Sequence, residues 1–99
     1  MPTAATDAPS LAARMRDGAC VYGLFVFSPD PAHTEIAGRA GFDFVIVDLE
    51  HAPLGIADVV AHVRAADAAG IATIVRVADS APAAAARLLD AGAAGIVFP

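Results

Sequence analysis

Three ionisable side chains directly follow one apolar run, and they are the residues of this chain best suited to chemistry. Residues 42–47 lead into Asp48, Glu50 and His51. Ionisable groups at the end of a buried strand cost free energy unless they are paired or used, so the cluster predicts a site. An imidazole beside carboxylates can act as a general base. The alternatives are a solvated loop, and a structural role for the histidine.

A single arginine interrupts the next apolar run, residues 73–77. The guanidinium of Arg76 needs an anion there, which can be Asp48 or Glu50 from the adjacent strand or a substrate carboxylate. Side chains alternate along a strand, so both carboxylates lie on the same side and can face one pocket. Their structural role, if they do no chemistry, is to pair with Arg76.

The composition excludes several function classes. All six basic residues are scattered arginines and the net charge is -5, which argues against a nucleic-acid partner. Without lysine, nothing in these 99 residues can form a Schiff base with a carbonyl substrate. The chain has no phosphate-cradling glycine loop, no paired-histidine metal motif and no Gly-x-Ser-x-Gly element. We assign no chemistry to His33 or His62.

Cysteine usage and hydropathy indicate a compartment. Cys20 is the one cysteine, so it forms no internal disulfide, and we expect it to be a small buried apolar residue. This usage suits the reducing cytoplasm, which is the expected location. No apolar run reaches the roughly 20 residues that span a bilayer, so no membrane partner is expected.

Apolar runs and helix signals alternate along the chain. We expect residues 1–9 to be disordered, and residues 10–99 to form one folded unit. The expected strands are residues 21–28, 43–50, 72–77 and 95–98. The expected helices are residues 11–16 after Ser10, residues 34–40, residues 56–69 before Gly70, and a helix capped by Asp79 or Ser80 with Pro82 in its first turn.

This alternation predicts an α/β fold of parallel strands with right-handed crossovers. Parallel strands must be covered on both faces, and four units supply half of a TIM (β/α)8 barrel, so we expect the amino-terminal half of such a barrel. A small open doubly wound sheet is the alternative. Barrel active sites form at the carboxyl ends of strands. The polar residues expected there are Ser28, Asp48, Glu50, His51, Arg76 and Asp79.

Several segments, in order and at similar spacing, together resemble the HpcH/HpaI aldolase family. They are residues 23–28 before Pro29, Glu35 and Ile36 with residues 40–44, Val-Asp-Leu-Glu-His at 47–51, Ile-Val-Arg-Val at 74–77, and Leu-Asp-Ala-Gly at 89–92 with residues 97–99. The resemblance implies a TIM-barrel, divalent-metal-dependent (class II) aldolase, a carbon–carbon lyase. Such an enzyme cleaves or forms the C–C bond next to pyruvate in 4-hydroxy-2-oxoacids, in aromatic or sugar-acid catabolism.

The resemblance also implies roles for individual residues. His51 matches the base that moves the proton of the aldol hydroxyl, and Arg76 matches the arginine that stabilises the enolate. Asp90 matches the aspartate that raises the basicity of this histidine. Asp48 and Glu50 resemble groups that hold water or support the site. The metal, Mg²⁺, Mn²⁺ or Co²⁺, takes a Glu and an Asp from later strands, so its ligands are expected beyond residue 99 and none in this chain.

The position of Asp90 implies an oligomer. It ends a helix that leads to the amino end of the next strand, near the barrel bottom and away from His51. If the two residues pair, Asp90 comes from another subunit of a homo-oligomer. Its structural alternative is a helix-end carboxylate, which the helix dipole disfavours.

Two other functions stay open beside an aldolase that acts on small oxoacids and aldehydes. One is a citrate-lyase-like or malyl-thioester-cleaving enzyme with related lyase chemistry. The other is a non-catalytic fragment with an assembly or regulatory role.

Overall fold

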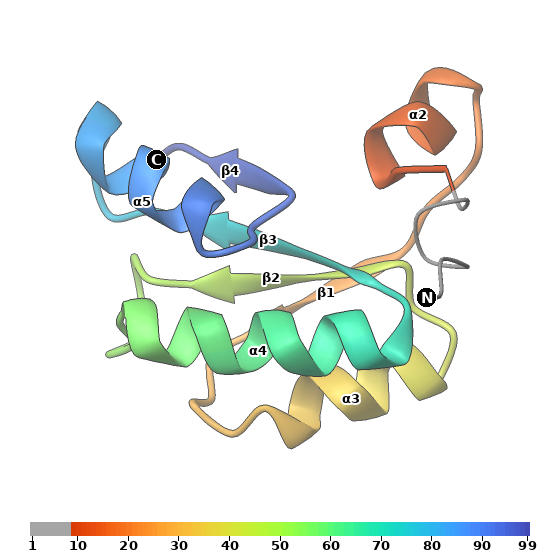
Figure 1. Ribbon diagram of the computed structural model, residues 1–99, viewed down its shortest axis with the longest axis horizontal. Coiled ribbons are helices and arrows are strands. Elements are labelled where there is room, and N and C mark those ends of the chain that lie inside the picture. Colours follow the sequence, from red (N-terminus) through yellow and green to blue (C-terminus); the bar gives the residue numbers. More distant parts are fainter. Residues whose placement is uncertain (1–8) are drawn as a thin grey trace.

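The computed structural model of the protein describes residues 9–99, which form a four-stranded parallel sheet with connecting helices (Figure 1). The strands are β1 (Gly23–Val26), β2 (Phe44–Asp48), β3 (Ala72–Arg76) and β4 (Gly95–Val97), and the helices are α2 (Leu11–Arg16), α3 (Ala32–Arg39), α4 (Ile56–Ala69) and α5 (Pro82–Asp90). We expected residues 1–9 to be disordered, and residues 1–8 of this range lie outside the described residues.

The strands pair in sequence order, β1-β2-β3-β4, and every pair is parallel. This confirms the α/β fold class. In the register, Asp48 stands beside Arg76 at the carboxyl ends of β2 and β3. We call this carboxyl-end edge the rim, made of residues 27–28, 48–51 and 76–79.

One face of the sheet is closed by helices. Helices α3 and α4 lie side by side along it (Figure 1). Its buried core comes from all three of the longer helices and from alternate strand residues, among them Ala37, Val45, Val47, Val59, Val63, Val75 and Leu88. The opposite face is not covered by the described helices. Phe25 on that face is 42% exposed, and Phe27, directly after β1, is 54% exposed.

The helix ends follow the local chemistry that the sequence indicates. The Ser10 hydroxyl accepts a hydrogen bond from the Ala13 amide at 3.1 Å, and so caps α2. Gly70 ends α4 with a φ of 77°, in the left-handed region that glycine adopts at little cost. None of the described helices has both the length and the apolar content needed to cross a membrane.

Two local expectations were wrong. The N-cap position of α5 is Ala81, not Asp79 or Ser80, and Pro82 is the first helical residue. The Asp79 carboxylate instead accepts a hydrogen bond from the Ala81 amide at 2.9 Å, so it shapes the turn before the helix. Cys20 is exposed rather than buried, because it lies in the segment before β1 and outside the core between helices and sheet.

Thr73 places a hydroxyl group in the core without a hydrogen-bond partner within residues 9–99. It lies on the helix-covered face of β3 and is 3% exposed. Its hydroxyl is the one buried side-chain polar atom among the described residues without a hydrogen-bond partner. Burying a hydroxyl without a partner costs free energy, so this position is a local weakness in the core.

We therefore expect Thr73→Val to raise the free energy of unfolding by about 1 kcal/mol, because the methyl keeps the shape and the desolvated hydroxyl is removed. Urea unfolding of the chain measures the change. The matched control is Val75→Thr, two residues along the same face, which should lower stability. A Thr73→Val variant less stable than the natural chain would show that the hydroxyl has a partner.

Candidate functional site

The centre of the rim is an ion pair between two adjacent strands. Asp48 ends β2 and is 0% exposed, and Arg76 ends β3. The Arg76 Nε donates to Asp48 Oδ1 at 3.2 Å, and Nη2 donates to Oδ2 at 2.9 Å. The sequence left Asp48, Glu50 and a substrate carboxylate as possible partners of Arg76. In the structure Asp48 makes the bidentate contact.

The same carboxylate organises the backbone that follows β2. Asp48 Oδ1 also accepts the amide N–H of Glu50 at 2.8 Å and of His51 at 3.2 Å. The hydrogen bond from Arg76, and then these two amides, lower the pKa of Asp48 to about 2, although burial acts in the other direction. The bond to Asp48 in turn raises the pKa of Arg76, so both groups are charged at neutral pH.

Glu50 lies between the ion pair and the histidine. Its Oε1 is 3.5 Å from Arg76 Nε and 3.5 Å from His51 Nε2. The His51 side chain is 64% exposed, whereas that of Glu50 is 25% exposed. The structure thus brings Asp48, Glu50, His51 and Arg76 into one network at the rim, with the imidazole as its most accessible member.

An aromatic pair supports the arginine from the open face of the sheet. The Arg76 guanidinium carbon lies 4.6 Å from the centre of the Phe25 ring, a cation–π contact. Phe25 stacks on Phe27, with ring centres 6.0 Å apart and planes 11° apart. Sequence reasoning missed Phe25. The signal was a pair of phenylalanines two residues apart, Phe25 and Phe27, which share one side of the strand, but only the strand register shows that this side meets Arg76.

One edge of the guanidinium is left for a ligand. Asp48 engages Nε and Nη2, and no hydrogen bond to Nη1 is found among residues 9–99. A guanidinium already held in place by a buried carboxylate can bind a second oxyanion without further ordering. The arrangement can therefore bind a carboxylate or stabilise an oxygen on which negative charge develops.

Three other candidates do not join this network. Ser28 lies at the rim, where its hydroxyl accepts the Asp30 amide at 3.1 Å, and Asp79 accepts the Ala81 amide. Both shape turns. Asp90 is exposed at the last position of α5, so it precedes the amino end of β4, away from His51. Within one chain, the described residues show no contact between Asp90 and His51.

The residues present do not make a metal site by themselves. No group of three or more His, Cys, Asp or Glu side chains is placed to hold a metal ion within the described part of the chain. Both oxygens of Asp48 are already engaged, by Arg76 and by two amides. The donor set of residues 9–99 therefore does not fit a resident metal.

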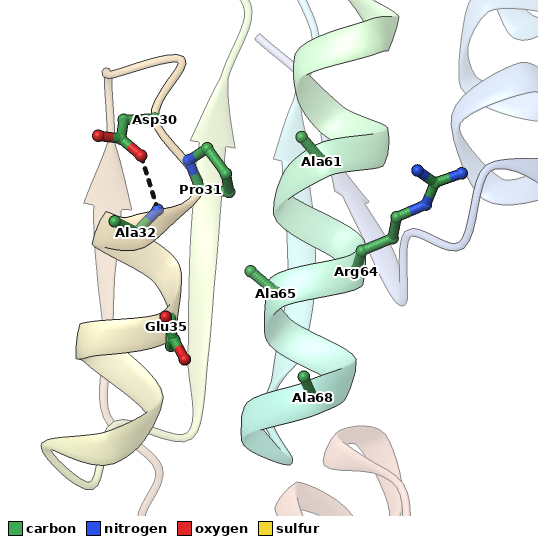
Figure 2. A pocket seen from close by; sticks show the side chains of 8 residues that line it. All are labelled: Asp30, Pro31, Ala32, Glu35, Ala61, Arg64, Ala65 and Ala68. Carbon is green, nitrogen blue, oxygen red and sulfur yellow. Dashed lines mark hydrogen bonds between the residues drawn. The ribbon is translucent and has the colours of Figure 1, made fainter.

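Two hollows lie away from the rim. A groove of about 530 Å³ runs between α3 and α4, and Figure 2 shows Ala61, Ala65 and Ala68 along it, with the Arg64 guanidinium directed away. A second, of about 650 Å³, lies at the amino-end edge beside the Arg14–Asp43 ion pair of 2.8 Å. Neither includes the rim network, which lies toward the uncovered face.

Comparison with known proteins gives the same assignment along most of the chain. Residues 21–99 match the family described as HpcH/HpaI aldolase/citrate lyase. The hydroxypyruvate/pyruvate aldolase of Paraburkholderia phytofirmans is 34% identical over 91 residues, which are 90% of this chain and 35% of that protein. The 5-keto-4-deoxy-D-glucarate aldolase of Klebsiella pneumoniae is 34% identical over 77 residues, 78% of this chain and 30% of that one.

Solved structures share the fold. An HpcH/HpaI aldolase from Desulfitobacterium hafniense superposes with a TM-score of 0.85 at 33% identity, covering 93% of this chain and 36% of that one. The citrate synthase SbnG superposes with a TM-score of 0.85 at 40% identity, covering 91% of this chain and 37% of SbnG. The chain thus spans about a third of the proteins it matches, and its fold is that of part of their TIM barrel.

The depressed pKa of Asp48 predicts a loss of stability in acid. Its folded pKa of about 2 lies below the roughly 3.9 of an unfolded aspartate, so its contribution is fully present above about pH 4 and is lost as pH falls toward about 2. Asp48→Asn should be less stable at neutral pH and should lose less stability over this window. Urea unfolding at stepped pH measures both effects.

Arg76→Gln is the matched control, because Arg76 is the largest cause of the shift. In that variant the Asp48 carboxyl, followed by its ¹³C resonance, should titrate at higher pH. An unchanged titration would contradict the assigned cause.

Proposed function

The chain belongs to the HpcH/HpaI aldolase/citrate lyase family, and on this basis we propose that it forms the amino-terminal part of an aldolase that cleaves or forms the C–C bond next to pyruvate. The substrates are 4-hydroxy-2-oxoacids. The observation that carries the proposal is the Arg76 guanidinium, held at the rim by Asp48 with Nη1 unengaged among the described residues, in one network with Glu50 and His51.

Arg76 would stabilise the charge that the reaction develops. In the cleavage direction the electrons of the C3–C4 bond move onto the keto oxygen, which becomes an enolate oxygen. A guanidinium fixed beforehand by Asp48 needs no reorganisation to meet that charge. The Phe25 ring under the guanidinium further restricts its position. The absence of lysine from these 99 residues is in keeping with an enolate rather than a Schiff base.

His51 would move the proton. As the C–C bond breaks, the imidazole takes the proton of the C4 hydroxyl, the aldehyde leaves, and the enolate is protonated to pyruvate. The accessible ring of His51 suits this role. Asp90 of a neighbouring subunit would raise the basicity of His51, so the enzyme would be a homo-oligomer with shared sites.

We also propose dependence on a divalent cation, Mg²⁺, Mn²⁺ or Co²⁺, with a Glu and an Asp from beyond residue 99 as its ligands. The proposed setting is the cytoplasm, in keeping with the single cysteine.

A citrate-lyase-like or malyl-thioester-cleaving enzyme is the second candidate, because the chain is 40% identical to the citrate synthase SbnG over the shared region. A requirement for a coenzyme A thioester would favour it. A free 4-hydroxy-2-oxoacid as substrate favours the aldolase.

A non-catalytic role for the 99-residue chain is the third candidate. Sedimentation velocity of the isolated chain tests it. A folded monomer with protected amides would favour this role, whereas aggregation through the uncovered face would favour an incomplete barrel.

The aldolase proposal predicts pyruvate release by the full product of the gene that carries this chain. With Mg²⁺, Mn²⁺ or Co²⁺, the release is coupled to lactate dehydrogenase and followed as NADH loss. His51→Ala should abolish most activity, and Arg76→Lys should lower it by about 10² to 10³, because one fixed charge stabiliser is lost. Chelation should abolish activity reversibly.

His33→Ala is the matched control, since His33 is an exposed residue of α3 and makes no contact with the network. Activity that survives His51→Ala or chelation would exclude the proposal.

Sharing of sites predicts complementation between two inactive variants. His51→Ala and Asp90→Asn subunits, unfolded together and refolded, should recover up to about a quarter of wild-type activity, because one site in four then draws an intact residue from each partner. Each variant refolded alone is the control. No recovery, with mixed oligomers present, would place both residues on one subunit or remove Asp90 from the site.

A further inference from the structure

His62 is a fully buried histidine that the rim network does not use. It lies on α4 and is 0% exposed. Its Nδ1 is 2.7 Å from the Thr34 hydroxyl of α3, and its Nε2 is 2.8 Å from the Ser28 carbonyl oxygen. One side chain therefore joins α4 both to α3 and to the segment that follows β1.

The two contacts fix the direction of both hydrogen bonds. A carbonyl oxygen can only accept, so the Nε2 of His62 carries the proton and donates to Ser28. In the neutral ring Nδ1 is then an acceptor, and the Thr34 hydroxyl donates to it. Both ring nitrogens of His62 therefore have a hydrogen-bond partner.

The other hydrogen bonds of the segment that His62 holds, residues 27–31, are local. Ser28 accepts from the Asp30 amide, and Asp30 accepts from the Ala32 amide at 3.0 Å. Apart from bonds to the first turn of α3, the His62 bond is the one hydrogen bond found between residues 27–31 and another part of the described chain. Removing it would free the connection between β1 and α3.

We propose that His62 is a positioning residue for the rim. Through the Ser28 carbonyl it fixes the end of β1. With that end it fixes Phe27, which stacks on Phe25, and the Arg76 guanidinium lies over the Phe25 ring. His62 acts from the helix-covered side of the sheet and does not touch the substrate. The link to catalysis rests on the proposed function, which takes Arg76 as the group that stabilises the enolate.

The test uses the full gene product and two measurements. His62→Leu removes both bonds, so deuterium uptake in a peptide covering residues 27–33 should become faster. The value of kcat should fall by about tenfold with a smaller change in KM, because a small displacement of Arg76 weakens charge stabilisation in the transition state. In His62→Gln, whose side-chain amide N–H can reach the Ser28 carbonyl, the deuterium uptake of residues 27–33 and kcat should both be closer to wild type than in His62→Leu.

Thr34→Val is the matched control. It removes the donor to Nδ1 and leaves the Ser28 bond, so it should lower thermal stability without changing uptake in residues 27–33 or kcat. The proposal is overturned by a folded His62→Leu variant with wild-type uptake and kcat, or by a Thr34→Val variant with an equal loss of kcat.

If His62→Leu does not fold, the comparison of His62→Gln with Thr34→Val decides. Slow, wild-type-like uptake in residues 27–33 of both supports the proposal, and fast uptake in His62→Gln overturns it. If the gene product releases no pyruvate, the proposed function fails, while the uptake measurement still tests the positioning of residues 27–33 by His62.

Discussion

The bond between Asp48 and Arg76 joins β2 to β3 at the point where both strands reach the rim. A buried carboxylate and its guanidinium stabilise each other only together, since either one alone would be an uncompensated charge. The same carboxylate also accepts two amides of the turn that carries Glu50 and His51. One carboxylate therefore links the two strand ends to the turn that carries Glu50 and His51, so this turn cannot shift without loss of these bonds.

The order of helices and strands could be predicted because the apolar runs and the helix-ending residues indicate the same boundaries. Each strand is a continuous apolar run, and glycines with positive φ, such as Gly70 and Gly92, follow the helices. The strand bounds were predicted too long, with residues 21–28 expected and Gly23–Val26 observed. Ladder hydrogen bonds stop where the neighbouring strand turns away, and an apolar run by itself carries no information about that neighbour.

The site could be predicted only as far as strand periodicity reaches. Alternation placed Asp48 and Glu50 on one side and brought Arg76 near them, but it could not decide which carboxylate would take the arginine. The observed register, with Asp48 directly beside Arg76, decides it. Phe25 was missed for the same reason. His62 looked like any residue on a helix face, because its partners Thr34 and Ser28 are 28 and 34 residues away.

The two faces of the sheet differ in a way that separates the alternative folds. Valines and His62 fill the face under α3, α4 and α5, whereas Phe25, Ile46 and Ile74 stand side by side on the other. The Asp48–Arg76 pair lies above this apolar layer, at the rim. A doubly wound sheet needs helices on both faces. Layers of side chains from neighbouring strands, with charged groups at the carboxyl end, are instead what the interior of a barrel presents. The position of the charges at the top of such a layer therefore argues for the barrel on physical grounds, independently of any relative.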